Sequence, residues 1–283
     1  MCIVVLTVVK SSLPTLTHVI PSQGRSGVHA VTSLDDDVFV VRHKSQQVEV
    51  YDAVTFTLQR HIEVPGLGEW TQGMTACARN KCLYLSVTER DNSSIQRVEL
   101  SGSNAEKKWS VASSPRGLSV NVAHNLVVAC QADDKIQEYT THGSLVREIC
   151  RHAGVTRPWH AIQLSTGDYV ISQWTIPGVV SVVGVDGQVI HSYGQSETSD
   201  VGQMKSPTSL AVTKNDNILV ADVNNHRILS INRSTGCVQE LALSVDDGIR
   251  HPGGLCLDES RGRLYVSELG VQCRVLVFDG VRL

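Results

Sequence analysis

Aromatic side chains are scarce in this 283-residue chain, at 5% of the residues, and there is little surplus of charge, with a formal net charge of −3. Proteins that bind nucleic acid through bulk electrostatics carry a basic surplus, and non-specific binders of single strands use stacked aromatic rings. The composition therefore disfavours DNA as a partner and leaves RNA only a local basic patch.

The cysteines form no metal-binding or redox motif. None of the eight stands in a C-x-x-C pair, so zinc ribbons, RING modules and thioredoxin chemistry find no support. Cys130 and Cys256 lie inside apolar runs, where a free cysteine behaves as a small hydrophobic residue. We therefore expect a cytoplasmic protein in a reducing compartment, with no metal and no cofactor.

Long hydrophobic runs are also missing. The apolar N-terminal stretch MCIVVLTVVK is interrupted by Lys10 and is far shorter than the ~20 residues that cross a bilayer. It lacks the basic start and the small-residue cleavage site of a signal peptide. We expect residues 1–15 to be a flanking segment, residues 16–283 to form a single domain, and the membrane not to be a partner.

What the chain does contain is an internal repeat of about 45 residues. Four units open with a proline that precedes a short apolar run. These are SPRGLSV at Pro115, RPWHAIQL at Pro158, SPTSLAV at Pro207 and HPGGLCL at Pro252. Two further segments, TQGMTAC from Thr71 and RSGVHAV from Arg25, match without the proline. The chain is therefore predicted to hold six repeat units.

Each unit has the rhythm of four short strands. A stronger β-branched run follows the first, as in ILVA at 218, and a third and usually a fourth run follow after polar turns. This pattern predicts an all-β fold, a six-bladed β-propeller of four-stranded antiparallel blades. A β-sandwich would not repeat six times, and a propeller of the WD-repeat class would contain Trp-Asp dipeptides, which are absent.

The last unit shows only three strands, ending in RVLVFDGVRL. An open ring would leave two exposed sheet edges, which promote aggregation. We therefore predict that TLTHVI, residues 15–20, supplies the missing strand, so that an N-terminal strand closes the propeller.

The stretch ILVADVNNHRILSI, residues 218–231, brings an acid, a histidine and a base close together. Asp222 ends one predicted strand and Arg227 begins the next, and the sixth unit has Glu268 and Arg274 in the same places. The pair recurs in two of six units, whereas a catalytic group would be unique in the ring. We therefore interpret both pairs as a hairpin latch, an ion pair across a turn, expected to be partly exposed and worth ~0.5–1 kcal/mol.

The pattern P-x-x-L-x-V, then ILVAD, NNHRI and a final VLVF, resembles the NHL repeat, whose signature includes the N-H-R segment. The resemblance implies a six-bladed propeller similar to the C-terminal NHL domain of tripartite-motif proteins. There the propeller binds a partner protein or an RNA, and a separate RING domain carries ubiquitin-ligase catalysis. This chain contains no RING pattern, so we expect no enzyme activity from it.

Basic residues recur at the connection that enters each innermost strand. They are Arg25, Arg116, Arg157, Lys205 and Arg250, with Trp70 in the second unit. These connections should emerge on one face around the central channel, where Trp159 adds an aromatic anchor. We call Arg25, Arg116, Arg157, Trp159, Lys205 and Arg250 the basic rim and expect it to bind an acidic peptide or RNA phosphates.

Two alternatives to partner-protein binding stay open. Acids on the same face, such as Asp133 and Asp134, dilute the basic rim, and this makes RNA the second interpretation. A metal-dependent propeller enzyme, a lyase or hydrolase, is the third, because His29, His160 and His251 lie near the starts of innermost strands. Their spacing matches no metal motif and no acid cluster joins them, so no catalytic or metal-binding residue is assigned.

Overall fold

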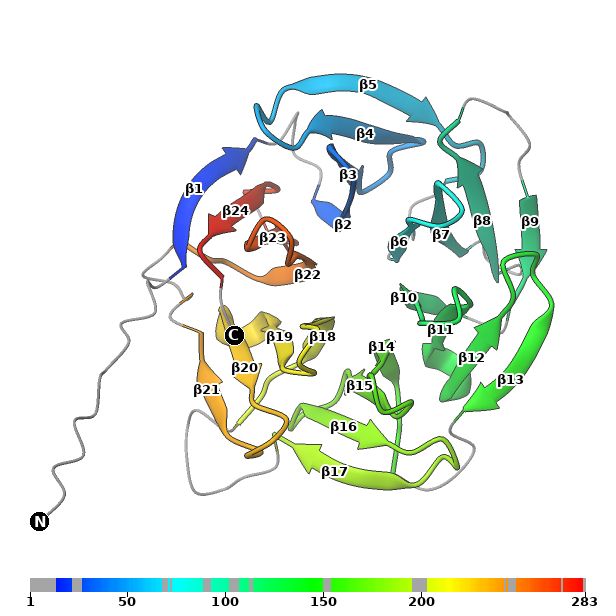
Figure 1. Cartoon of the computed structure of the whole chain (residues 1–283), viewed down its shortest axis with the longest axis vertical. Coiled ribbons are helices and arrows are strands. Elements are labelled where there is room, and N and C mark those ends of the chain that lie inside the picture. Colours follow the sequence, from blue (N-terminus) through cyan, green and yellow to red (C-terminus); the bar gives the residue numbers. More distant parts are fainter. Residues whose placement is uncertain are drawn as a thin grey trace, which may run out of the picture.

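The computed structural model describes residues 14–21, 27–67, 71, 73–88, 93–101, 107–111, 114–149, 154–194, 203–241, 243, 248–270 and 272–281. These residues form six antiparallel sheets of four strands, arranged as blades around a central channel (Figure 1). The predicted fold class is therefore confirmed. The described helical segments are two single turns, η1 (Gln131–Asp133) and η2 (Val223–Asn225), and neither approaches the length of a membrane-spanning helix.

Each blade runs from an innermost strand at the channel to an outermost strand at the outer wall of the ring. Blade one contains β2 (Val28–Leu34), β3 (Asp37–Arg42), β4 (Gln47–Asp52) and β5 (Leu58–Glu63). Blade two contains β6 (Met74–Cys77), β7 (Cys82–Thr88), β8 (Ser93–Glu99) and β9 (Lys107–Ser110). Blade three contains β10 (Pro115–Val120), β11 (Leu126–Cys130), β12 (Lys135–Tyr139) and β13 (Leu145–Ile149).

The second half of the ring follows the same order. Blade four contains β14 (Pro158–Gln163), β15 (Tyr169–Gln173), β16 (Val179–Val183) and β17 (Val189–Tyr193). Blade five contains β18 (Pro207–Val212), β19 (Ile218–Asp222), β20 (Arg227–Ile231) and β21 (Val238–Glu240). Blade six contains β22 (Pro252–Asp258), β23 (Arg263–Glu268), β24 (Val275–Asp279) and the N-terminal strand β1 (Thr15–Ile20).

The core lies between the blades. Blades five and six share one apolar cluster, which includes Leu219, Ile228, Leu264, Leu276 and Phe278, all fully buried. Every residue of β19 is buried, because each middle strand packs against a neighbouring blade on both faces. This is why the second strands read as continuous apolar runs and not as alternating ones.

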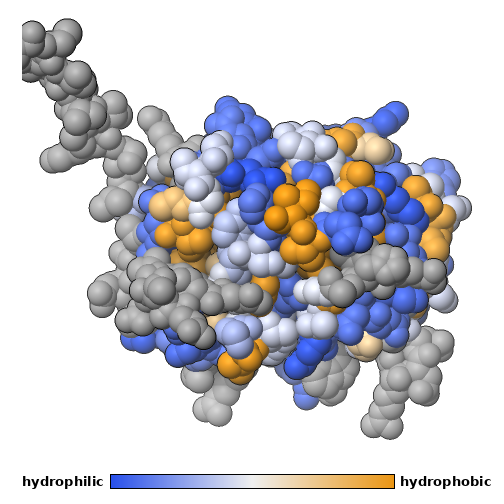
Figure 2. All heavy atoms as spheres, turned by 90° about the horizontal axis from the view of Figure 1, so that it is seen from below, coloured by the Kyte–Doolittle hydropathy of each residue, from blue (hydrophilic) through white to orange (hydrophobic). Residues whose placement is uncertain are grey.

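The outer wall of the ring is different. The side seen edge-on in Figure 2 mixes hydrophilic and apolar side chains, and its coloured part shows no continuous apolar band. A few exposed apolar residues lie on three outermost strands: Leu16 on β1, Leu145 and Val146 on β13, and Ile190 on β17. Scattered apolar residues of this kind are normal on a soluble protein surface.

The ring closes through β1, as predicted. It pairs antiparallel with β24, from Thr15 opposite Asp279 to Ile20 opposite Val275. Ile20 is fully buried in the cluster between blades six and one. The strand begins at Thr15, so it includes one residue of the expected flanking segment, and residues 1–13 lie outside the described part.

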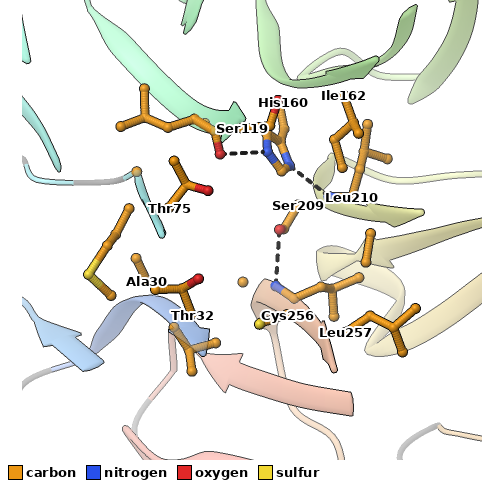
Figure 3. Close-up of a pocket in the computed structure, with 18 of the residues that line it drawn as sticks. Ala30, Thr32, Thr75, Ser119, His160, Ile162, Ser209, Leu210, Cys256 and Leu257 are labelled. Atoms are coloured by element: carbon orange, nitrogen blue, oxygen red, sulfur yellow. Dashed lines mark hydrogen bonds between the residues drawn. The ribbon is translucent and has the colours of Figure 1, made fainter. Parts of the chain in front are cut away.

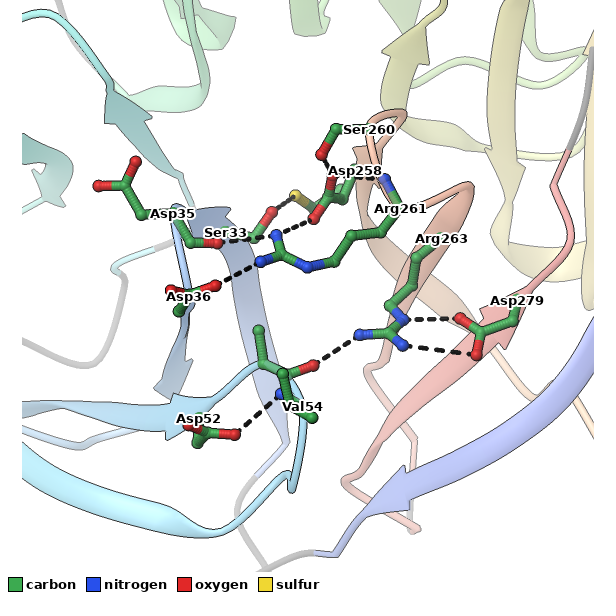
Figure 4. A network of polar contacts seen from close by, with 12 residues as sticks. Ser33, Asp35, Asp36, Asp52, Val54, Asp258, Ser260, Arg261, Arg263 and Asp279 are labelled. Atoms are coloured by element: carbon green, nitrogen blue, oxygen red, sulfur yellow. Dashed lines mark hydrogen bonds and ion pairs between the residues drawn. The ribbon is translucent and has the colours of Figure 1, made fainter.

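Two arginines reinforce this seam (Figure 4). Arg263 binds Asp279 at 2.6 Å within blade six and donates to the carbonyl oxygen of Ala53 in blade one, also at 2.6 Å. Arg261 binds Asp258 at 2.8 Å and reaches Asp36 across the seam. Because Asp36 is largely exposed, that last pair adds little, and the half-buried Arg263 pair is the stronger tie.

Deleting residues 1–20 should destabilise the ring, because it removes β1 and exposes the edge of β24. Loss of a buried isoleucine alone costs ~2–5 kcal/mol, so the midpoint of thermal unfolding should fall by roughly 10 °C. Deleting residues 1–13 leaves β1 in place and is the matched control. Equal thermal midpoints and equal size-exclusion profiles for the two deletions would contradict closure by β1.

Candidate functional site at the channel mouth

The hairpin latch of blade five is buried. The Asp222 carboxylate accepts hydrogen bonds from Arg227 Nε at 3.0 Å, from Asn225 Nδ2 at 2.7 Å and from the backbone N–H of Lys205 at 2.7 Å. Asp222 is 0% exposed, and burial raises its pKa against the lowering effect of these donors. The expectation of a partly exposed pair was wrong, because the loop that enters β18 lies against the pair: Gln203 accepts from Arg227, and Lys205 donates to Asp222.

The latch of blade six is built in the same way. Glu268 accepts from Arg274 Nε at 2.8 Å and from the backbone N–H of Arg250 at 2.7 Å. In blade four the neutral Gln173 accepts from the backbone N–H of Thr156 at 2.7 Å. The shared role is to tie the end of the second strand to the loop entering the innermost strand, which is a structural task.

Blade one has a latch of its own that the sequence comparison missed. Arg42 occupies the position of Asp222, and it binds Glu49 on the next strand at 2.8 and 2.9 Å. Both side chains are buried. The acid and base have exchanged strands, and the acid lies seven residues along the chain, so a search for the Asp-then-Arg order does not find it.

The basic rim lies at the end of the channel where the innermost strands begin, which we call the channel mouth. Arg157, Lys205 and Arg250 are exposed, and Arg116 is half-buried. Lys205 and Arg250 hold the latch carboxylates through their backbone N–H groups, which leaves their side chains at the surface. Arg25 and Trp70 lie outside the described residues.

Arg116 and Trp159 are brought together across two blades. The guanidinium carbon of Arg116 lies 4.9 Å from the ring centroid of Trp159, a cation–π contact. Trp159 in turn packs against Trp174, with ring centroids 4.3 Å apart. We call Arg116, Trp159 and Trp174 the arginine stack. Sequence reasoning missed Trp174, although the apolar turn that holds it, WTIP from 174 to 177, was an available signal.

The channel holds a cavity of ≈ 270 Å³ lined by all six innermost strands (Figure 3). Its wall carries small polar groups from different blades, among them Thr32, Thr75, Ser119, Ser209 and Cys256. Its volume lies just below the range of ~300–1,000 Å³ typical of drug-sized ligands. The cavity therefore fits one side chain or a small molecule.

His160 is the most buried titratable group in this wall. Its Nε2 faces the carbonyl oxygen of Leu118 at 3.2 Å and so carries the proton, while its Nδ1 accepts from the N–H of Leu210 at 3.0 Å. The ring thereby bridges blades three, four and five, and burial lowers its pKa to about 4. It also fills the space above Gly117, where a Cβ would lie 2.5 Å from Cδ2 of His160.

The three histidines of the enzyme interpretation do not form a metal site. Both nitrogens of His160 are in use, Nδ1 of His29 binds the carbonyl oxygen of Thr71 at 2.8 Å, and His251 packs edge-on against His226. Within the described ranges, no group of three or more His, Cys, Asp or Glu side chains is placed to hold a metal ion.

Arg116 and Arg157, on neighbouring blades, place positive charge close together at the channel mouth. Burial and then the nearby charge of Arg157 lower the pKa of Arg116. Burial also lowers the pKa of His29, with further lowering by His43 and by Arg116. The exposed backbone N–H of Arg157 is held by the Asp134 side chain, so an acid borders this positive region on its outer side.

The architecture is that of a six-bladed β-propeller. Residues 204–229, which include the latch of blade five, match the NHL repeat, and the match is to the repeat and not to tripartite-motif proteins in particular. No curated protein sequence matches the chain.

Several solved structures are similar to the whole chain. A streptogramin B lyase is 14% identical over 93% of this chain and 96% of its own, with a TM-score of 0.64. A virginiamycin B lyase from Staphylococcus aureus is 14% identical over 90% of this chain and 82% of its own, with a TM-score of 0.63. An aldose sugar dehydrogenase from Streptomyces coelicolor, in its PQQ-bound form, is 13% identical over 94% and 97%, with a TM-score of 0.69. At such identities the likeness concerns the fold alone.

Replacing Asp222 by alanine should destabilise the protein by about 3–5 kcal/mol, because it removes the buried carboxylate that binds Arg227 and leaves that arginine only a contact of 3.5 Å with Glu240. The control is Asp37→Ala, which breaks the exposed Arg60–Asp37 pair of 3.1 Å and should cost less than about 1 kcal/mol. Urea denaturation measures both free energies of unfolding. Similar values for the two variants would show that the latch is not a structural tie.

His160 should make stability depend on pH. Its folded-state pKa of about 4 lies below its ordinary 6.5, so the unfolded chain binds more protons between these values. The free energy of unfolding should therefore fall by roughly 3 kcal/mol as the pH drops from 6.5 towards 4. His160→Gln should flatten this slope, while His61→Gln, on the exposed face of β5, should not. Equal slopes in both variants would refute the assignment.

Proposed function

We propose that this propeller is a non-catalytic, cytoplasmic recognition module that binds a partner protein at the channel mouth. The arginine stack carries the proposal, because tryptophan and arginine dominate the energetic centres of protein interfaces. Ile176 supports it: this side chain lies two residues beyond Trp174 on the same turn and is 80% exposed. An exposed isoleucine on the same turn as a tryptophan of the arginine stack is a suitable anchor for a partner.

The resemblance to tripartite-motif proteins suggests a context for this binding. If the propeller works with a ubiquitin ligase, partner binding selects the substrate, and a RING domain of the same or another protein supplies the catalysis. The proposal for the propeller itself requires only partner binding.

RNA binding is the second candidate, favoured by the exposed Arg157, Lys205 and Arg250 on one face. Asp134 borders Arg157, and with the neighbouring exposed Asp133 it would repel an extended phosphate chain, which is why we rank RNA below protein. A lyase or hydrolase is the third candidate, suggested by the channel cavity and by the similar lyase structures. The engagement of His160 and His29 in structural hydrogen bonds weighs against it.

Ile176→Asp should weaken binding of a partner peptide about tenfold, because it buries a charge at the interface centre. The probes are the peptides most enriched when a displayed random-peptide library is selected on the folded propeller, and fluorescence polarisation gives their dissociation constants. Val122→Asp is the matched control, since Val122 is 77% exposed on the β10–β11 turn at the opposite end of the channel. Binding that responds to Val122→Asp and not to Ile176→Asp would place the interface elsewhere.

A random pool of single-stranded RNA separates the second candidate from the first. If RNA is the ligand, its affinity falls steeply with salt and is abolished by combining Arg116→Glu with Arg157→Glu. Salt-sensitive RNA binding without any enriched peptide would replace partner protein by RNA. Enriched peptides with no RNA retention support the proposal.

A further inference from the structure

Arg116 is held in one position by its neighbours. Its Nε donates to the side-chain oxygen of Gln131 at 2.9 Å, and its guanidinium plane lies over Trp159. Gln131 is itself fixed, since it is buried and its backbone N–H donates to the carbonyl oxygen of Ser114 at 3.0 Å. Trp174 supports the far side of the stack. A guanidinium held in this way loses little freedom when it binds a ligand.

The two terminal nitrogens of Arg116 remain available. Neither forms a hydrogen bond with any residue in the described ranges. Neither is fully buried, so a ligand can reach both. The latch arginines differ, because Arg227 and Arg274 each bind a carboxylate of their own blade. At Arg116 a neutral amide takes Nε, and no acid in the described ranges binds the two terminal nitrogens.

The surroundings favour an anion at this fork. The charge of Arg157 lowers the pKa of Arg116, and the charge of Arg116 in turn lowers the pKa of His29 across the mouth. Within the described ranges, no carboxylate is among the causes that shift the pKa of Arg116, so its charge has no described counter-ion. A single anionic group bound here would relieve the repulsion between the cations.

Resting on the proposed function, we propose that the partner presents a carboxylate to the channel mouth, where the two terminal nitrogens of Arg116 bind it side by side. A planar fork of this kind matches the two oxygens of a carboxylate. The cavity of ≈ 270 Å³ beneath the mouth fits one side chain and not a chain of nucleotides. The positive region is a spot bordered by Asp134 and not a continuous track, which again suits a single acidic group of a protein.

Four small probes test this site on the full chain without any partner. N-acetylglutamic acid α-amide carries only a side-chain carboxylate, N-acetylglutamine carries only a terminal one, and N-acetylglutamine amide is the neutral control. Inorganic phosphate is the fourth. Titrations followed by the indole N–H resonances of Trp159 and Trp174, at constant ionic strength, should show saturable shifts with a carboxylate probe and none with the neutral amide.

The variants separate the fork from simple charge. Arg116→Lys keeps the charge but loses the fork, and it should weaken carboxylate binding at least ~fivefold. Gln131→Met keeps Arg116 but removes the hydrogen bond that holds it, and it should also weaken binding. Arg79→Lys is the control, because Arg79 is exposed on the β6–β7 turn at the other end of the channel. Thermal midpoints establish that each variant is folded.

The outcomes are distinct. Saturable binding of either carboxylate probe that Arg116→Lys weakens supports the site, and the two probes tell a side chain from a chain terminus. Binding of phosphate alone, linear shifts, or equal affinity in Arg116→Lys would overturn it. Peptides that depend on Ile176 while no carboxylate probe binds would overturn this site and leave the partner face standing. Probe binding with no enriched peptide would support the carboxylate site and overturn the proposed partner-protein binding.

Discussion

Packing of apolar side chains between neighbouring blades is the interaction on which the rest of the molecule depends. Each blade needs a blade on both sides, because its middle strands are apolar on both faces. A chain with two ends meets that need only if the ring closes, which β1 achieves by completing blade six. The seam arginines Arg261 and Arg263 strengthen this join, but the buried Ile20 and its neighbours provide its apolar core.

Closure also determines what the channel mouth is made of. Six innermost strands begin there, and each is a sheet edge with backbone N–H groups that no strand of its own blade binds. Side chains of the preceding blade accept some of them, as His160 does for Leu210 and Ser209 does for Leu255. The polar groups of the channel wall therefore serve the ring first. Arg116 at the mouth differs, because its two terminal nitrogens bind no described residue of the ring and are left for a ligand.

Much of the fold could be predicted because it repeats. The opening prolines and the apolar second strands recur at a fixed period. The last unit lacks the fourth strand that this period requires, so the closing role of β1 could be predicted without a homologue. The latches of Asp222 and Glu268 were recognised for the same reason. Contacts between blades could not be predicted: His160 bonds residues 42 and 50 positions away, and the stack of Arg116 on Trp159 joins separate repeats. The exchanged pair Arg42–Glu49 escaped because it breaks the period itself.

The close contact between Gly117 and His160 makes two distant positions share one volume. The imidazole occupies the space in which any larger residue at position 117 would place its first side-chain carbon. The backbone carbonyl oxygen of Trp159 lies 2.7 Å from the same point, so replacing His160 by a smaller residue would remove only one of the two obstacles and would leave the N–H of Leu210 without its acceptor. Among descendants of this chain, position 117 should consequently stay glycine even where residue 160 changes, because a backbone atom cannot be exchanged for a smaller one.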